Sequence, residues 1–329
     1  MSNTLNVHAI RIHEHGGPEV MKWEEVEVSA PGANEVRIQT TAAGLNYIDT
    51  YHRSGMYKIP LPSVIGREAA GVVESVGAGV SEFKAGDRVA YASSPIGSYA
   101  EVRLMPAERL VKIPDGISDQ QAASMMLKGM TAQYLLRRTH CVQPGDVILF
   151  HAAAGGVGLI LGQWAKHLGA TVIGTVGSDE KIALAKAHGY DHIINYRTED
   201  FVARVAEITD GKKCRVVYDG VGKDTFMKSL DCLAPLGLMA SFGAASGAVP
   251  PVYVGDLTSR GSLYLTRPTL DTYVAKRDDL VNTANDLFDV VKRGIVKIEI
   301  NQTYALKDAA QAHRDLEARK TTGSTVLIP

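Results

Sequence analysis

Hydrophobic and polar positions follow one pattern in the first third of the chain and another in the middle. Before residue 120, apolar residues come in short alternating or β-branched runs, the pattern of half-buried strands. We expect strands at Val7–Ile12, Glu35–Thr41, Gly71–Val76 and Arg88–Ala90. Turns rich in glycine and proline separate these runs. Short strands between frequent turns are typical of a mostly β module of Greek-key or barrel-like form.

From about residue 120 the pattern becomes an alternation of helices and strands. Apolar residues at helical spacing predict helices over Gln120–Thr139, Val157–Leu168, Asp179–His188, Glu199–Thr209 and Lys223–Leu233. Between and after them we expect strands at Val147–His151, Thr171–Val176, His192–Asn195, Arg215–Tyr218, Gly237–Phe242 and Ser262–Leu265. Such alternation requires parallel strands joined by right-handed crossovers, and therefore a doubly wound sheet.

After Pro268 the chain has too few elements for a third domain. We expect helices over Asp278–Arg293 and Leu306–Ala318 and strands at Val296–Ile300 and Ser324–Ile328. The chain of 329 residues accommodates two domains, so this last part is predicted to return and complete the first one.

A glycine-rich turn joins the strand Val147–His151 to the helix that follows it. The dinucleotide-binding fingerprint places three glycines in such a turn, and the corresponding residues here are Ala153, Gly155 and Gly158. Backbone amides at the helix start then face the pyrophosphate, aided by the helix dipole. The alternative is a glycine loop that only caps the helix.

The end of the next strand indicates which coenzyme is preferred. An NAD site carries Asp or Glu about 20 residues beyond the glycines, whereas Val176 stands there. Ser178 can cap the next helix, and Lys181 can reach a 2′-phosphate as a point charge. These features favour NADPH over NADH, although Asp179 and Glu180 count against it and Lys181 could be an ordinary solvated lysine.

Composition and charge exclude several classes of protein. Hydrophobic residues make up 45% and charged residues 22% of the chain, the balance of a globular protein, and the net charge of −1 favours neither nucleic acid nor membrane surfaces as partners. Cys141, Cys214 and Cys232 are too widely spaced for a disulfide framework or a zinc finger. The chain shows no signal peptide and no apolar run of about 20 residues, so a cytoplasmic location is expected.

Short motifs in a fixed order carry a family resemblance along the whole chain. They are Gly16–Val20, Gly44–Tyr51, Gly66–Gly71, Leu127–Thr131, Ala152–Gly158, Val217–Asp219, Thr266–Pro268 and Leu327–Pro329. In these motifs the chain resembles quinone oxidoreductases of the zeta-crystallin type, in the zinc-independent branch of the medium-chain dehydrogenases/reductases. The resemblance implies an α/β fold with a GroES-like, mostly β catalytic domain over residues 1–127, a Rossmann domain with a parallel sheet over 128–268, and a C-terminal return over 269–329.

The resemblance also implies roles for individual residues. Asn46 and Tyr51 line the cleft near the nicotinamide and substrate, and Lys128 lies beside the nicotinamide, so these three are the candidate catalytic residues. The residues implied in cofactor binding are Asn46, Lys128, Thr131, Gly155, Gly156, Val157, Gly177, Ser178, Lys181, Tyr196, Phe242, Leu265, Arg267 and Arg319. Of these, Gly155–Val157 hold the pyrophosphate, while Gly177, Ser178, Lys181, Tyr196 and Arg319 gather around the 2′-phosphate. Phe242, Leu265 and Arg267 contact the nicotinamide side.

The chain departs from the zinc alcohol dehydrogenases of the same superfamily. Those enzymes carry a catalytic Cys where Asn46 stands and a His where Arg67 stands, and His52 and Glu68 do not make a ligand set alone. We therefore expect no metal site. An acceptor that needs no Lewis acid is expected instead, because a quinone or an alkene conjugated to a carbonyl delocalises the charge it gains.

The expected activity is NADPH-dependent reduction of a small quinone by hydride or electron transfer in an interdomain cleft. Tyr51, Asn46 and Lys128 would donate hydrogen bonds to the oxygen that gains charge. An NADPH-dependent alkenal or enone reductase is the nearest alternative, and a nucleotide-binding protein without enzymatic activity is another. The resemblance further implies a homodimer, formed by edge pairing through Ser262–Leu265.

Overall fold

Two units make up residues 4–329, the part of the chain that the computed structural model describes. Unit 1 contains the chain up to Met130, together with Val274–Phe288 and Ile298–Pro329. Unit 2 contains Thr131–Tyr273 and Asp289–Lys297. The sequence placed the corresponding changes after residues 127 and 268, and did not assign residues 289–297 to the second domain.

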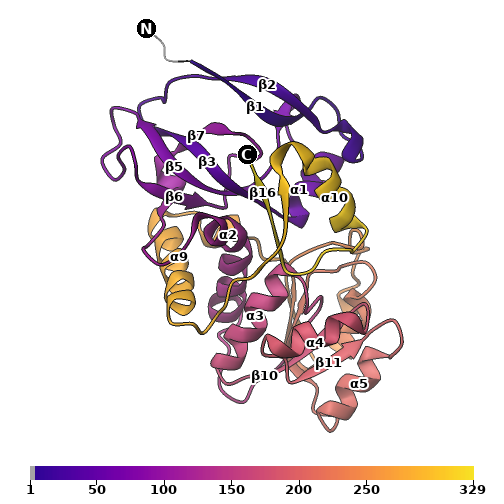
Figure 1. Cartoon of the computed structure of the whole chain (residues 1–329). Coiled ribbons are helices and arrows are strands. Elements are labelled where there is room, and N and C mark those ends of the chain that lie inside the picture. The colour runs from indigo at the N-terminus through magenta and orange to yellow at the C-terminus, as the bar shows by residue number, and fades with distance from the viewer. Residues whose placement is uncertain (1–3) are drawn as a thin grey trace. The chain divides into compact units, whose positions relative to one another are not determined.

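Unit 1 is built on two sheets (Figure 1), in which every pairing except that of the last two strands is antiparallel. The larger sheet has the order β15-β16-β3-β5-β6-β8, with β7 also paired to β3. Its strands are β3 (Glu35–Leu45), β5 (Glu68–Val76), β6 (Arg88–Tyr91), β7 (Val102–Pro106), β8 (Val111–Lys112), β15 (Ile300–Ala305) and β16 (Ser324–Ile328). The smaller sheet has the order β2-β1-β4 and consists of β1 (Leu5–Ile12), β2 (Lys22–Val28) and β4 (Ser63–Val64).

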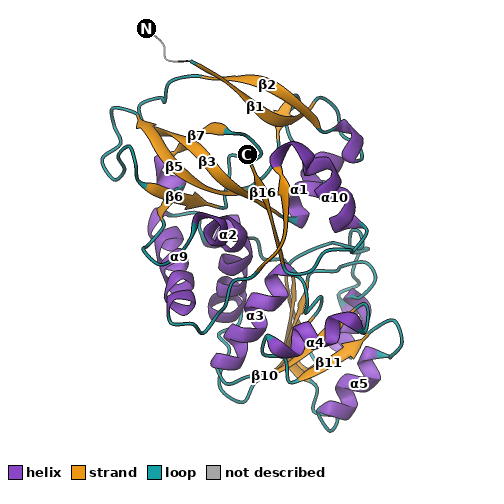
Figure 2. Cartoon of the chain, viewed as in Figure 1, coloured by secondary structure: helices purple, strands orange, loops and turns teal. Residues whose placement is uncertain are grey.

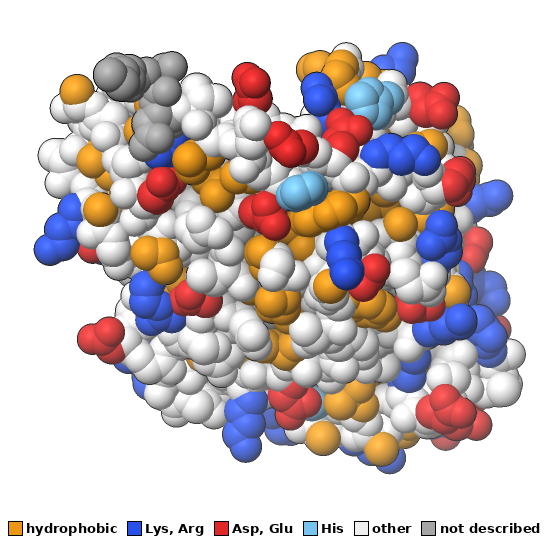
Figure 3. Space-filling view, turned by 45° about the horizontal axis from the view of Figure 1, so that its top comes forward, with side chains coloured by type: hydrophobic (Ala, Val, Ile, Leu, Met, Phe, Trp, Pro, Cys, Tyr) orange, Lys and Arg blue, Asp and Glu red, His pale blue; other side chains and the backbone are white. Residues whose placement is uncertain are grey.

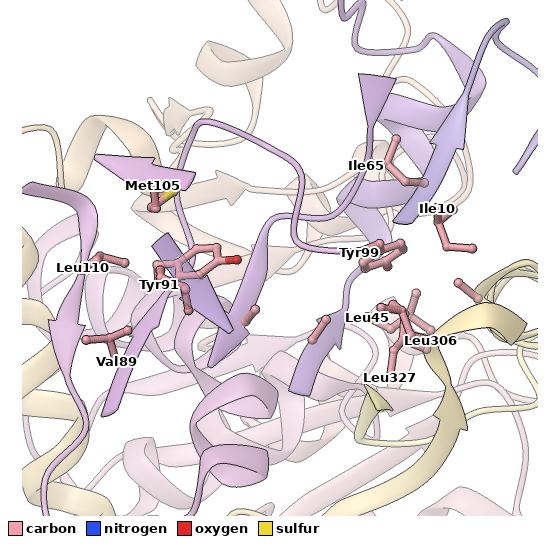
Figure 4. Packing of buried hydrophobic residues seen from close by; sticks show 14 of the residues in the cluster. Ile10, Leu45, Ile65, Val89, Tyr91, Tyr99, Met105, Leu110, Leu306 and Leu327 are labelled. Carbon is pink, nitrogen blue, oxygen red and sulfur yellow. The ribbon is translucent and has the colours of Figure 1, made fainter. Parts of the chain in front are cut away.

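The C-terminal segment completes the larger sheet of unit 1. β16 pairs antiparallel with β3, with Leu327 opposite Ala43, and parallel with β15. Figure 4 shows the apolar core beneath this pairing, where Leu45, Leu306 and Leu327 lie close together. Because alternate residues of a strand face the same side, these few positions join the first and last segments of the chain in one core.

Four longer helices accompany these strands: α1 (Tyr47–Ser54), α2 (Asp119–Tyr134), α9 (Arg277–Lys292) and α10 (Ala309–Glu317). α1 begins directly after β3 because Asn46 is its N-cap, and the Asp49 carboxylate accepts the Asn46 backbone N–H at 2.9 Å. Gly55, in the left-handed region at φ 81°, ends it. α1 and α10 lie side by side (Figure 1), and the ion pair of Arg53 with Glu317 joins them.

Unit 2 contains a six-stranded sheet in the order β11-β10-β9-β12-β13-β14, with every pairing parallel. Its strands are β9 (Val147–Phe150), β10 (Thr171–Val176), β11 (His192–Asn195), β12 (Cys214–Asp219), β13 (Leu233–Ser241) and β14 (Tyr264–Thr266). The helices are α3 (Gly156–His167), α4 (Glu180–Ala187), α5 (Phe201–Ile208), α6 (Phe226–Asp231), α7 (Gly255–Ser259) and α8 (Leu270–Tyr273) (Figure 2). This strand order is that of the dinucleotide-binding fold, and it confirms the predicted doubly wound sheet.

Three element predictions differ from the structure for local reasons. The strand predicted over Val296–Ile300 is wrong, since β15 starts at Ile300 and the amides of Ile295 and Val296 donate to the Val290 carbonyl at the end of α9. The helix predicted to Thr139 ends at Tyr134 and continues as a π-helical turn. The edge strand predicted from Ser262 starts two residues later, because Ser262 has φ 55° and belongs to the preceding turn.

The surface carries charges of both signs, as the net charge of −1 leads one to expect. Lys and Arg side chains are interspersed with Asp and Glu side chains over the face in Figure 3. Within residues 4–329, no helix combines the length and apolarity needed to cross a membrane.

Candidate active site

The predicted phosphate-binding turn lies where β9 meets α3. Ala152 adopts φ 60°, the Ala153 N–H donates to the Thr175 carbonyl at 2.9 Å, and Gly155 is the extended N-cap of α3. A Cβ at Gly158 would lie 2.5 Å from the carbonyl oxygens of Ala152 and Ala153, so the helix start packs on the strand end as only glycine permits. Gly156 and Val157 are the first residues of α3, whose amides have no partner within the helix. The turn therefore fits a dinucleotide pyrophosphate.

The end of β10 gathers the residues expected around a 2′-phosphate. Val176 is buried at the strand end, and a Cβ at Gly177 would lie 2.8 Å from the Tyr196 hydroxyl. The backbone N–H of Lys181 donates a hydrogen bond to the Ser178 carbonyl oxygen at 3.2 Å. Unit 2 thus brings Gly177, Ser178, Lys181 and Tyr196 together, whereas Arg319 belongs to unit 1, where it follows α10 with φ 60°.

The nearest carboxylate beyond β10 is already engaged. Asp179 Oδ1 accepts a hydrogen bond from Asn195 Nδ2 at 2.7 Å. This contact directs the Asp179 carboxylate toward the end of β11. Glu180, the other acidic residue that counts against a 2′-phosphate, begins α4 and is exposed.

The residues expected on the nicotinamide side follow the two strands at the other edge of the sheet. The Phe242 N–H donates to the Asp219 carbonyl at 2.9 Å, and its ring lies 5.7 Å from that of Phe150. Arg267 donates to the Ser241 carbonyl at 2.8 Å, which holds the end of β14 against that of β13. Leu265 lies on β14 with 39% of its surface exposed.

A buried polar network, which the sequence did not predict, ties three strand ends of unit 2 together. His151 lies 2.9 Å from the hydroxyls of both Thr175 and Ser229, and Ser229 donates to Asp219 at 2.9 Å. Asp219 also accepts the Val221 N–H at 2.8 Å. Burial lowers the pKa of His151, with the charge of Asp219 opposing that shift. A neutral histidine therefore fixes the strand end that leads into the phosphate-binding turn.

In unit 1, two candidate residues, Asn46 and Lys128, contact one buried carboxylate. Glu68, at the start of β5, is fully buried and its Oε2 accepts hydrogen bonds from Asn46 Nδ2 at 2.7 Å and from Lys128 Nζ at 3.1 Å. The amide of Asn46 also lies 3.3 Å from the Gly44 carbonyl. The structure therefore brings Asn46 and Lys128 together, from α1 and α2, through a residue that the sequence did not select for this role.

A second buried network starts at the N-terminus of α1. Tyr99 donates to Asp49 Oδ2 at 2.8 Å, and the Tyr99 hydroxyl lies 3.3 Å from Nε2 of His313. Nδ1 of His313 lies 3.0 Å from Arg53, which is paired with Glu317. Burial raises the pKa of Asp49 to about 7, against hydrogen bonds from Tyr99 and the Asn46 backbone and the charge of Lys128. Burial and the charge of Arg53 lower the pKa of His313 to about 3.

Tyr51 and Thr131 are candidates that these networks do not include. Tyr51 is 8% exposed on α1, and its ring lies 5.2 Å from that of Tyr57. Thr131 is buried on α2 as the first residue of unit 2. Burial raises the pKa of Tyr134, and a hydrogen bond with Thr131 opposes that rise.

The side chains around Glu68 do not fit a zinc ion. Asn46 and Lys128 present N–H donors to the Glu68 carboxylate, and N–H donors are not metal ligands. The positively charged Lys128 ammonium would also repel a zinc ion at this carboxylate. Within residues 4–329, no group of three or more His, Cys, Asp or Glu side chains is arranged to hold a metal ion.

Comparison with known proteins decides the family. Residues 32–115 match the alcohol dehydrogenase GroES-like domain and residues 156–277 match the family described as zinc-binding dehydrogenase. A quinone oxidoreductase of Pseudomonas aeruginosa is 55% identical over 97% of this chain and 99% of its own length. The chain belongs to the quinone oxidoreductases of the medium-chain dehydrogenase/reductase superfamily. The predicted resemblance is thereby confirmed.

Two further members of this family are informative. The crystal structure of Escherichia coli quinone oxidoreductase complexed with NADPH superposes with a TM-score of 0.96 at 51% identity, covering 98% of this chain and 100% of the other. A 2-haloacrylate reductase from a Burkholderia species is 50% identical over 98% of this chain and 99% of its own length. These two similar proteins are thus named for different acceptors, a quinone and a 2-haloacrylate.

Two functional features escaped the sequence reasoning. Glu68 was considered only as part of an incomplete zinc ligand set, although the spacing of Gly66 and Gly71 around it marked a motif. In the network of Asp49, Tyr99 and His313, Tyr99 contacts a residue 214 positions away in the chain, and no local pattern signals such a contact.

Proposed function

We propose that this protein uses NADPH to reduce quinones. The observation that carries the proposal is the end of β10, where the first two positions after the strand, Gly177 and Ser178, carry no carboxylate. Val176 is buried and apolar, Gly177 and Ser178 follow it, and Asp179 is bonded to Asn195. The E. coli relative that was crystallised with NADPH supports the same coenzyme.

Unit 2 supplies the coenzyme-binding groups in this proposal. The amides at the start of α3 bind the pyrophosphate, since the positive end of the helix dipole favours an anion there. Ser178, Lys181 and Tyr196 bind the 2′-phosphate, and Arg319 is proposed for the same phosphate on the strength of the family resemblance. Phe242, Leu265 and Arg267 are proposed for the nicotinamide end, with Thr131.

Unit 1 supplies the groups that serve the acceptor. NADPH, when bound, provides the hydride. The acceptor carbonyl oxygen then gains negative charge, which donors aimed at that oxygen stabilise and which a proton from water finally neutralises. Lys128 and Tyr51 are the proposed donors, and Lys128 carries the positive charge of the two. Asn46, whose two amide hydrogens go to Glu68 and Gly44, is proposed to hold Glu68 in place.

An enone or haloacrylate reductase is the second candidate. The Burkholderia relative, named 2-haloacrylate reductase and 50% identical, favours it. Both candidates place charge on an oxygen conjugated to the carbon that is reduced, so the same donors suit either acceptor. They differ only in the shape and the reactivity of the acceptor.

An acceptor screen separates the two. NADPH oxidation is followed by absorbance with a series of benzoquinones and naphthoquinones and with a matched series of enones and 2-haloacrylates. We expect the highest kcat/KM with quinones. Faster turnover of enones or haloacrylates would replace quinone reduction by the second candidate, and tight NADPH binding without turnover of either series would overturn both.

Assembly and location are part of the same proposal. We propose a homodimer paired through β14, the edge strand of the sheet in unit 2, where Tyr264 is 60% and Leu265 is 39% exposed. Exposed apolar residues on an edge strand favour pairing with a second copy. A cytoplasmic location remains the expectation from the sequence.

A further inference from the structure

Glu68 lies at the centre of the acceptor-serving residues without having a proposed role of its own. Its carboxylate is fully buried and accepts three hydrogen bonds. Oε2 receives Asn46 Nδ2 at 2.7 Å and Lys128 Nζ at 3.1 Å, and Oε1 receives the Leu127 backbone N–H at 2.7 Å. One carboxylate therefore contacts two of the three candidate catalytic residues.

The neighbouring strand leaves room for this carboxylate. Gly44 lies opposite Glu68 in the pairing of β3 with β5. A Cβ at Gly44 would lie 2.2 Å from Glu68 Oε2 and 2.1 Å from the Ala123 carbonyl oxygen. Both distances are far below van der Waals contact, so any larger residue at position 44 would displace the carboxylate or α2.

The carboxylate also inserts into α2 at the turn that carries Lys128. In a regular α-helix, the N–H of Leu127 points at the carbonyl of Ala123, four residues earlier. Here that N–H reaches Glu68 Oε1 at 2.7 Å. This hydrogen bond ties the backbone of α2 to the carboxylate at Leu127, and Lys128 is the next residue.

Stability alone does not account for this arrangement. A buried ion pair costs desolvation energy that its attraction recovers only in part, and apolar residues of the same volume often serve stability equally well. Lys128, with only 5% of its surface exposed, is also held away from water. Because burying Glu68 and Lys128 costs desolvation energy, we infer that the position of the Lys128 charge serves function rather than stability.

We propose that Glu68 is a positioning residue that sets Lys128 for the acceptor oxygen. Asn46 gives its amide hydrogens to Glu68 and Gly44, so it braces the carboxylate. An ammonium has three N–H donors, and one bond to Glu68 orients the others toward the acceptor oxygen as charge develops there. The inference rests on the proposed function and identifies Lys128 as the principal donor among the candidates.

The first test is Glu68→Gln, which keeps the volume and removes the charge and one acceptor. Because a misplacement of about 1 Å can reduce the rate by about 100-fold, we expect kcat for quinone reduction to fall about 10- to 100-fold. The KM for NADPH should change by less than about twofold, because uniform binding is not affected. An unchanged kcat in Glu68→Gln would overturn the proposal.

A double-mutant cycle separates positioning from a structural role. Lys128→Met removes the donor, and if Glu68 acts through Lys128, the double variant is no slower than Lys128→Met alone. Losses of kcat that multiply would show that Glu68 acts independently and would contradict the proposal. Lys128→Arg retains the charge with a different geometry, and should also lose kcat. Full activity in Lys128→Arg would refute the need for a fixed position even if Glu68→Gln failed to fold.

The matched control is Glu74→Gln on the same strand. Glu74 is paired with Arg37 at 2.6 Å, with its side chain 36% exposed, and it contacts none of the proposed donors. Its kcat should equal that of the wild type. NADPH binding followed by fluorescence verifies that each variant is folded. Wild-type protein that reduces no quinone would refute the proposed function, whereas an active wild type with an equally active Glu68→Gln would refute only the role of Glu68.

Discussion

Asp49 makes the free energy of unfolding of unit 1 depend on pH in a direction opposite to most carboxylates. Its side chain has no exposed surface, and Oδ2 accepts hydrogen bonds from Tyr99 and from the Asn46 backbone, while Oδ1 has no partner. Burial raises its pKa from 3.8 to about 7, Glu68 adds to the rise, and Lys128 and the two hydrogen bonds oppose it. His313 and Arg53 lie beyond Tyr99.

The sign follows from the proton count. Between pH 4 and 7 the folded protein holds a proton on Asp49 that the unfolded chain has released, so stability is fully present below the unfolded pKa and is lost as pH rises through 7. The rise in the Asp49 pKa from 3.8 to about 7 corresponds to about 4 kcal/mol of stability in total, of which about 3 kcal/mol is lost between pH 5 and 8. Asp49→Asn is isosteric and cannot ionise. The stability of the wild type relative to this variant should therefore fall by about 3 kcal/mol over that interval.

Urea unfolding at several pH values measures this difference. The two tryptophans lie in different units, Trp23 in unit 1 and Trp164 in unit 2. In a Trp164→Phe background, fluorescence reports unit 1 through Trp23, and linear extrapolation gives its free energy of unfolding. His313, whose pKa is lowered to about 3, destabilises wild type and variant alike on acidification below its unfolded pKa, so it cancels in the difference.

Asp87→Asn is the matched control. Asp87 also lies in unit 1, but its hydrogen bond with Lys112 lowers its pKa, so its contribution is complete above pH 4 and does not change between pH 5 and 8. A wild-type stability that runs parallel to that of Asp49→Asn across this interval would show that Asp49 is ionised throughout, and the reasoning from burial would be refuted.

Three further expectations concern the coenzyme site and the assembly. Gly158→Ala should lower the free energy of unfolding of unit 2 by about 1–3 kcal/mol and weaken NADPH binding, because its Cβ would clash with two carbonyl oxygens; unchanged binding by fluorescence titration would contradict the turn geometry. Lys181→Ala should weaken NADPH binding about tenfold and leave NADH binding unchanged, since a hydrogen bond to a charged group contributes about 1.5 kcal/mol or more; equal losses for both coenzymes would refute the phosphate role. Tyr264→Asp on β14 should convert a dimer to a monomer in sedimentation velocity, and a persistent dimer would place the interface elsewhere.

Local patterns predicted most of unit 2 because its elements depend on short-range periodicity. The strands Thr171–Val176 and His192–Asn195 coincide with the sequence prediction residue by residue, since β-branched runs end there at turns. The glycine turn before α3 was found for the same reason. Each of these features is encoded within about ten residues.

Unit 1 was harder because its decisive residues are charged and buried. Asp49, His52 and Arg53 on α1 resemble an exposed helix in the sequence, yet all three are buried. Their partners come from distant segments, as when Arg53 meets Glu317. A pattern of apolar residues cannot show which polar side chains are buried, so neither α1 nor the role of Glu68 was predicted.

The two buried networks of unit 1 meet at Asn46, and their charges constrain each other there. Glu68 holds the Asn46 side chain and Asp49 holds its backbone N–H. An ionised Asp49 would leave two carboxylates facing one ammonium, a net negative charge that opposes negative charge on an acceptor oxygen. A protonated Asp49 leaves the pair of Glu68 and Lys128 balanced. Because its pKa is raised to about 7, Asp49 adds no negative charge beside Lys128 up to neutral pH. Lys128 then stabilises a developing oxyanion without opposition from a second carboxylate.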